Sequence, residues 1–248
     1  MTLRLVIWLV LLAGAALAAG TRDLADAWLA SGPRSARLVA SPTGDWWLAA
    51  AHGRLFGMPE LPQLGLLAAC RRPRWRVELA WERLGSDLYR EDQLRGRWTV
   101  GTCWQLGVAG SVDRLLLAGQ PRSGASAALV VAGPLGAQCR WSLDWSLLPA
   151  PEWYGERGLR RWLRLEYDGA EAAATVALDR RVNATPAVQA EALMRLTSGV
   201  AWGLRYDGGG GAVGLVTVWC RSGLTLRSSH LAHPDLGLTH RWTLAVSP

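Results

Sequence analysis

The feature that most constrains the fold is an alternation of apolar and polar side chains with a period of two. In residues 75–82 (WRVELAWE) the odd positions are large or apolar, and the even positions are charged or small. Residues 94–100, 139–145, 200–206 and 236–244 repeat this alternation. Successive side chains of a strand point to opposite faces, so each segment has one apolar face and one polar face. The pattern therefore predicts amphipathic β-strands.

Turn signals such as Arg72-Pro73, Asp168-Gly169 and Ser222-Gly223 separate these segments. We therefore predict an all-β, antiparallel up-and-down fold of about 14 strands, or about 12 if residues 112–118 and 223–228 are loops. The expected strands are 45–53, 62–71, 74–84, 93–108, 112–118, 125–132, 137–147, 159–167, 171–179, 187–196, 200–206, 212–220, 223–228 and 235–246.

The N-terminus is typical of a secretory signal peptide, residues 1–18. Arg4 supplies the positive charge, Leu5 to Ala13 form the apolar region, and Ala16-Leu17-Ala18 fits the cleavage pattern. We expect an exported protein with an N-terminal segment at 19–43, containing a short helix or extended stretch, and a β domain at 44–248.

Alternation alone leaves two architectures open. A soluble periplasmic β-sandwich or lipid carrier would bury the apolar face. An outer-membrane β-barrel would turn that face to lipid and line its lumen with the polar face. The chain has 15 tryptophans and one phenylalanine, and indoles at strand ends suit a membrane interface. The predicted interfacial aromatics are Trp46, Trp47, Trp98, Trp104, Trp145, Trp162, Trp219 and Trp242.

Short connections such as Arg72-Pro73 alternate with longer loops such as 148–158, which also favours an outer-membrane transmembrane β-barrel. Residues 52–61 (HGRLFGMPEL), 85–91 (GSDLYRE) and 229–240 resemble bacterial outer-membrane proteins of the FadL/PorV-like type. This resemblance implies a barrel of about 14 strands in the outer membrane and assigns no substrate.

The polar face suggests what the interior of such a barrel does. One interpretation is a narrow, slightly anion-preferring porin-like pore with a transport or secretion-associated role, because rings of arginine lower the barrier for anions. The other is a sealed structural or interaction barrel, cross-braced by Arg–Glu pairs. The residues expected to line the lumen are Arg76, Glu78, Glu82, Arg95, Arg97, Arg140, Asp144, Glu191, Arg195, Arg205 and Arg241.

The 27 basic side chains, all arginine, exceed the 20 acidic ones and give a net charge of +7. This balance suits contact with anionic outer-membrane lipid and lipopolysaccharide. External loops offer a place for secretion or envelope partners. Nucleic acid is not expected, because the arginines are spread over many strands.

We expect no enzyme activity and no cofactor, because the sequence contains no hydrolase, metalloprotease or nucleotide-binding motif. His230 and His233 could hold a metal with Asp235, but their turn context favours a solvated loop. The four cysteines are widely spaced, which favours free thiols over disulfides.

Overall fold

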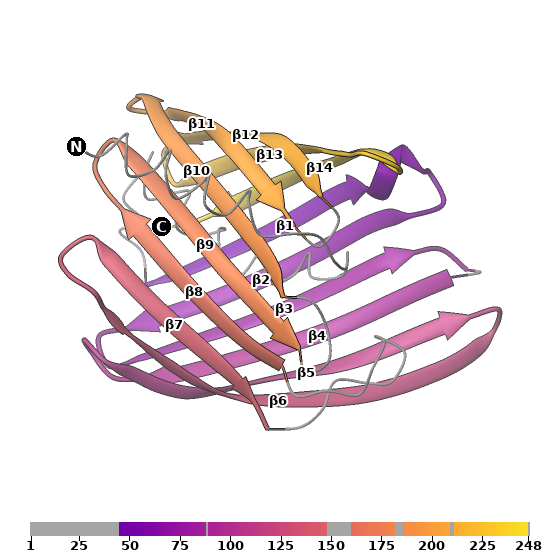
Figure 1. Cartoon of the computed structure of the whole chain (residues 1–248), viewed down its shortest axis with the longest axis horizontal. Helices are drawn as coiled ribbons and strands as arrows, with labels where there is room; N and C mark the ends of the chain where they lie inside the picture. The colour runs from indigo at the N-terminus through magenta and orange to yellow at the C-terminus, as the bar shows by residue number, and fades with distance from the viewer. Residues whose placement is uncertain (1–44, 88, 148–159, 182–185, 209–210, 248) are drawn as a thin grey trace.

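The computed structural model describes residues 45–87, 89–147, 160–181, 186–208 and 211–247. The predicted signal peptide and the segment 19–43 lie outside these residues. The described strands form one closed antiparallel barrel, in which each strand pairs with its sequence neighbours and β1 pairs with β14 (Figure 1). The strands are β1 (Trp46–Arg54), β2 (Pro62–Arg72), β3 (Trp75–Gly85), β4 (Tyr89–Val100), β5 (Gln105–Leu117), β6 (Gln120–Pro134), β7 (Cys139–Ser146), β8 (Arg160–Asp168), β9 (Ala172–Arg181), β10 (Ala187–Thr197), β11 (Val200–Asp207), β12 (Ala212–Arg221), β13 (Leu224–His233) and β14 (Gly237–Val246).

The closed topology confirms the all-β, up-and-down barrel and excludes the β-sandwich alternative, which would need two separate sheets. Residues 112–118 and 223–228 belong mostly to β5 and β13, so the 12-strand alternative is wrong. A single 3₁₀ turn at Leu55–Gly57 follows β1. Among the described residues, no helix is long and apolar enough to cross a membrane.

One expected strand, residues 93–108, is in fact two strands joined by a tight turn at 101–104. Gly101 has φ +124°, and a Cβ there would lie 1.9 Å from the carbonyl oxygen of Trp104. Val100 pairs with Leu106 and Trp98 with Val108, so even positions stay on one face through the turn. Because the alternation continues with the same parity across this hairpin, the sequence pattern does not indicate that the chain reverses direction there.

The two faces of the barrel differ as a membrane barrel requires. Large apolar side chains are exposed on the outer face, including Leu66 at 55% and Leu79 at 50%. On the inner face, Glu78 is only 4% exposed and Asp113 only 1%. This is the reverse of a soluble protein, where charged side chains are rarely buried and apolar ones seldom cover a whole face.

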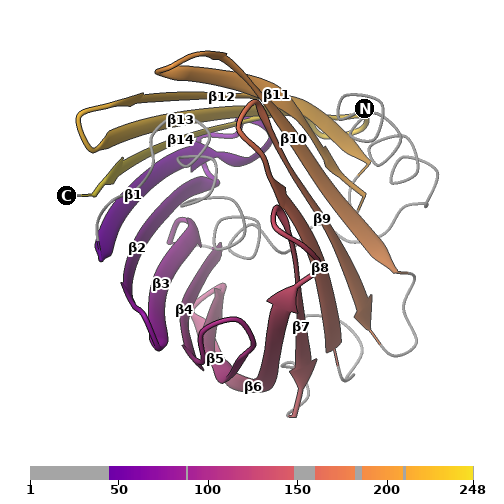
Figure 2. The same cartoon turned by 90° about the vertical axis from the view of Figure 1, so that its left-hand side faces the viewer.

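The two ends of the barrel carry different connections. Figure 2 shows the strands arranged in a ring. One end, here named the turn end, holds the connections 73–74, 101–104, 135–138, 169–171, 198–199 and 222–223. The opposite end, here named the loop end, holds 55–61, 86–88, 118–119, 147–159, 182–186, 208–211 and 234–236. No connection at the turn end is longer than four residues, whereas the loop end carries short turns together with the longer connections 55–61, 147–159 and 182–186.

The predicted interfacial tryptophans gather mainly at the turn end. Trp46, Trp98 and Trp219 lie on the outer face within three residues of strand termini there, and Trp104 lies in the turn itself. The Trp104 ring packs edge-on against Trp141, with 5.8 Å between ring centroids. Trp145 and Trp242 are also on the outer face: Trp145 lies near the loop end of β7, and Trp242 lies in the middle of β14.

Trp47 and Trp162 do not follow the expected outward placement. Trp47 packs on the inner face with Ala49 and Leu67. Trp162 is 4% exposed, and its cross-strand neighbours are Asp144 and Asp179, whose carboxylates lie on the inner face. The Arg164 guanidinium carbon lies 5.9 Å from the centroid of the Trp162 ring.

Candidate functional site: the inner face of the barrel

The strand register places all the predicted lumen-lining residues on the face that the barrel encloses. The same face carries further polar residues that the sequence analysis missed. They include Gln63, Arg71, Gln93, Asp113, Arg164, Glu166, Asp168, Asp179 and Arg227. In β8 the signal was present, because Arg164, Glu166 and Asp168 alternate with Leu163, Leu165 and Tyr167.

A buried ion-pair group occupies the inner face of β10 to β13. The guanidinium of Arg227 donates to both carboxylate oxygens of Glu191, at 3.0 and 2.5 Å. Arg205 lies 3.9 Å from the same carboxylate. All three residues are less than 9% exposed. A bidentate pair with a second arginine holds the buried carboxylate in its charged form.

A second group joins β14 to β2 and β3. Arg241 lies 3.6 Å from a carboxylate oxygen of Glu82, which also accepts a hydrogen bond from Gln63. Between them, Gly53 of β1 pairs with Arg241, and a Cβ there would lie 2.6 Å from the His240 carbonyl oxygen and 3.3 Å from Arg241 Cα. The bare glycine leaves room for the arginine side chain to pass over β1.

A third group lies on the inner face of β4 to β7. Arg97 donates to Asp144 at 3.1 Å, although β5 and β6 separate their strands. The residues in register with Arg97 on those two strands are Ala109 and Ala128. Their small side chains let the long arginine lie along the wall.

These three groups share one geometry. Each pair joins strands no more than three apart around a ring of fourteen, whereas the opposite wall lies about seven strands away. The ion pairs just described therefore run along the wall, with none of them spanning the interior from side to side.

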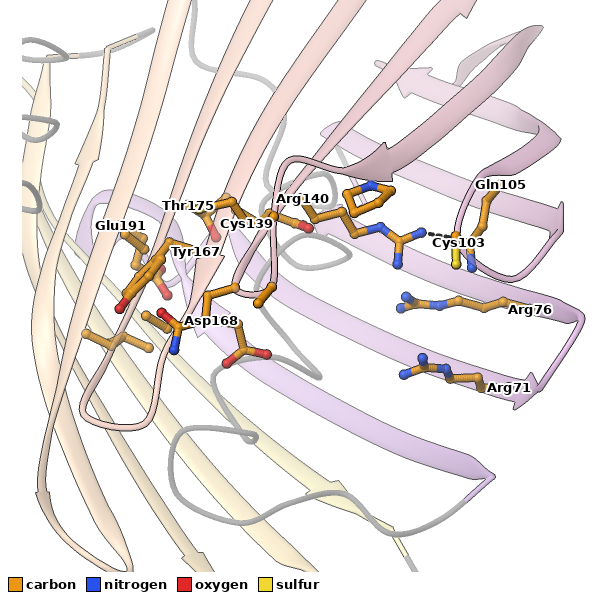
Figure 3. A pocket seen from close by; sticks show the side chains of 18 of the residues that line it. Arg71, Arg76, Cys103, Gln105, Cys139, Arg140, Tyr167, Asp168, Thr175 and Glu191 are labelled. Atoms are coloured by element: carbon orange, nitrogen blue, oxygen red, sulfur yellow. Dashed lines mark hydrogen bonds between the residues drawn. The ribbon is translucent and has the colours of Figure 1, made fainter. Parts of the chain in front are cut away.

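A pocket of about 300 Å³ opens on the inner side at the turn end. Figure 3 shows the side chains of Arg71, Arg76 and Arg140 gathered on one side of it, where Arg140 donates to Gln105. Figure 3 also shows Asp168 and Glu191 on the other side. Arg76 also pairs with Glu78 on its own strand. The pocket thus separates positive and negative charge across its width.

Two apolar clusters flank this end of the inner face. One contains Leu193, Ala201, Val216 and Val218, and the other contains Ala49 and Leu67. The sequence signal for them is a loss of alternation, as at 215–218 (LVTV), where apolar residues occupy both parities. These apolar clusters cover part of the inner face, so the polar part of that face becomes narrower near the arginine-lined pocket.

The histidines do not form a metal site in the part of the chain that the structure describes. His233 Nδ1 accepts the backbone N–H groups of Asp235 and Leu236, each at 3.1 Å, as a solvated turn requires. His230 and His240 are cross-strand neighbours with 2.7 Å between their Nδ1 atoms. All four cysteines, in strands β2, β7 and β12 and in the 101–104 turn, are free thiols.

No protein-family model matches the chain, and no curated protein matches it. Among solved structures, it is similar to the Acinetobacter baumannii outer membrane protein Omp33, with 9% identity, a TM-score of 0.54, and coverage of 83% of this chain and 98% of that one. The KdgM porin aligns at 7% identity and a TM-score of 0.49, covering 82% and 99%. At these identities the likeness shows the fold alone, and it does not support the FadL/PorV-like type. The chain thus has the fold of an outer-membrane β-barrel.

Proposed function

We propose that the protein is a porin-like channel of the outer membrane, with a water-filled lumen that passes small hydrophilic solutes and slightly prefers anions. Neighbouring strands lie about 4.8 Å apart and tilt by about 40°, so fourteen strands give a backbone radius of roughly 14 Å. Eight-stranded barrels are filled by their side chains, whereas barrels of 16 to 18 strands hold aqueous channels. In a barrel of fourteen strands, the inner side chains decide whether the lumen is filled or holds water.

The observation that carries the proposal is the course of the inner ion pairs. Arg227–Glu191, Arg241–Glu82 and Arg97–Asp144 each follow the wall over a few strands. Charged side chains held flat in this way are satisfied by one another, and they leave the centre of the barrel to water. A sealed barrel would instead need side chains that meet across the interior.

The anion preference follows from the turn-end pocket. Three guanidinium groups, those of Arg71, Arg76 and Arg140, gather on one side of it (Figure 3). On the opposite side, Glu191 is already bound by Arg227. Glu166 and Asp168 also line the pocket, so the preference that the arginine side gives to a passing anion is slight.

Reversal potentials across a planar bilayer under a KCl gradient test this proposal. The wild-type channel should show a reversal potential of anionic sign, and the triple variant R71Q/R76Q/R140Q should move it toward the cationic side. R221Q is the matched control, since Arg221 is an exposed arginine at the turn end of β12 on the outer face. An unchanged reversal potential in the triple variant would contradict the proposed selectivity.

A further inference from the structure

The outer face at the loop end carries two arginines that the pore does not use. Arg161 is the second residue of β8, and Arg180 is the penultimate residue of β9. The register sets them directly opposite each other, and both are exposed. Like charges placed opposite each other destabilise a sheet. Among the described residues, no carboxylate pairs with either arginine.

An aromatic platform holds one of the two guanidinium groups. The Arg161 guanidinium carbon lies 4.1 Å from the centroid of the Trp145 ring. Trp145 is the penultimate residue of β7 and is 42% exposed on the outer face. Tryptophan at that place marks the headgroup level of a bilayer, and a cation over its face is oriented by the ring.

The rest of this rim is also positively charged. On β3 to β5, Asp92 is 2.6 Å from Arg83 and 3.1 Å from Arg90, and it is in register with Arg114. Two arginines thus share one carboxylate, and a third lies in register with it. Arg54, the last residue of β1, is exposed on the same face.

We propose that Arg161 and Arg180, with Trp145, form a binding site for a phosphate group of the phosphorylated glycolipid in the leaflet at the loop end. Guanidinium groups match phosphate oxygens in a bidentate fork, and two of them from adjacent strands neutralise a group of charge near −2. A phosphate between the arginines also removes the repulsion that their register imposes. The excess of arginine over acid on this rim calls for an anionic leaflet. The site takes no part in conduction, so the test of lipid binding is independent of the test of the channel.

Titration of the folded full chain in detergent with bis-phosphorylated lipid A tests the site. The double variant R161Q/R180Q should weaken binding by about thirtyfold, roughly fivefold for each arginine at a membrane surface. R221Q, which changes an exposed outward arginine at the turn end, should leave the affinity unchanged. Equal affinity in the wild type and the double variant would overturn the proposal.

The lipid itself supplies the second comparison. Dephosphorylated lipid A should bind the wild type as weakly as bis-phosphorylated lipid A binds R161Q/R180Q. Phosphatidylglycerol that binds as tightly, with the same dependence on both arginines, would overturn the assignment to a glycolipid. Heat-modifiable gel migration shows whether each variant is folded. If the double variant does not fold, R180Q alone serves as the test, with an expected loss of about fivefold.

Discussion

Arg227 and Glu191 form a bidentate ion pair, with N–O distances of 3.0 and 2.5 Å, although β11 and β12 separate their strands. The pair ties four consecutive strands together on the inner face. Both side chains are less than 9% exposed, so each neutralises a charge that water reaches poorly. Removing one partner should therefore lower the free energy of unfolding strongly. The intact pair should raise it by less, relative to uncharged side chains of similar shape.

The first prediction concerns this pair. R227Q leaves the Glu191 carboxylate with Arg205 at 3.9 Å, and it should lower the free energy of unfolding by about 3–5 kcal/mol. E191Q/R227Q removes both charges and should restore at least half of the loss. Urea unfolding in lipid vesicles gives the values for R227Q, E191Q and the double variant. A double variant as unstable as the sum of the single changes would show that the two side chains are not coupled.

The second prediction concerns the glycine under Arg241. G53A should lower the free energy of unfolding by about 1–3 kcal/mol, because the new Cβ meets the His240 carbonyl and the Arg241 backbone. Gly96 is the matched control: it also lies within a strand, and a Cβ there meets nothing within 4 Å. G96A should change stability by less than about 0.5 kcal/mol. Equal effects at the two glycines would contradict the close approach of Gly53 to the backbone of β14.

The third prediction concerns how the cost of a charge on the outer face depends on its depth in the bilayer. Leu79 lies near the middle of β3 and points outward, so L79R should cost about 2–4 kcal/mol in a bilayer. Val246, the last residue of β14, also points outward, and V246R should cost no more than about 1 kcal/mol. The same unfolding measurement compares them. Similar costs at both positions would argue against a bilayer around the barrel.

The fourth prediction separates inner from outer tryptophans. Brominated lipids quench indoles that touch acyl chains, so W98F should reduce the quenched share of the fluorescence. W162F should leave the intensity lost to quenching unchanged, because Trp162 is buried on the inner face. A loss of quenching in W162F would place this indole against lipid.

Much of this fold could be predicted from the sequence, because strand parity fixes which side chains share a face. The alternation of Arg76 and Glu78 with Val77 and Leu79 assigned all four residues to the faces that they occupy. The parity also kept Trp98 and Leu106 on one face, which hid the reversal at 101–104. Only the positive φ of Gly101 explains that turn, and a glycine in the sequence does not reveal its φ.

The sequence predicts the structure less well where alternation is weak, or where alternation and position along a strand indicate different faces. The position of Trp162 near a strand end predicts an interfacial side chain, whereas its alternation with Leu163 and Leu165 puts it inside. Arg227 lies in the segment 223–228, which the sequence leaves open as a strand or a loop, so its place on the inner face is not predicted. The partners of Arg241 and Arg97 could not be predicted, since they depend on which strands lie side by side and on the small residues between them.

The central claim is that the inner ion pairs leave an open lumen, and liposome swelling with the purified, folded chain tests it most directly. Liposomes that contain the protein should swell when they are placed in an isotonic solution of a small neutral sugar. They should not swell in a sugar polymer too large for a barrel of this radius. R221Q should behave as the wild type. If folded protein in the bilayer gives no swelling with the smallest sugar, the barrel is sealed and the proposed channel is wrong.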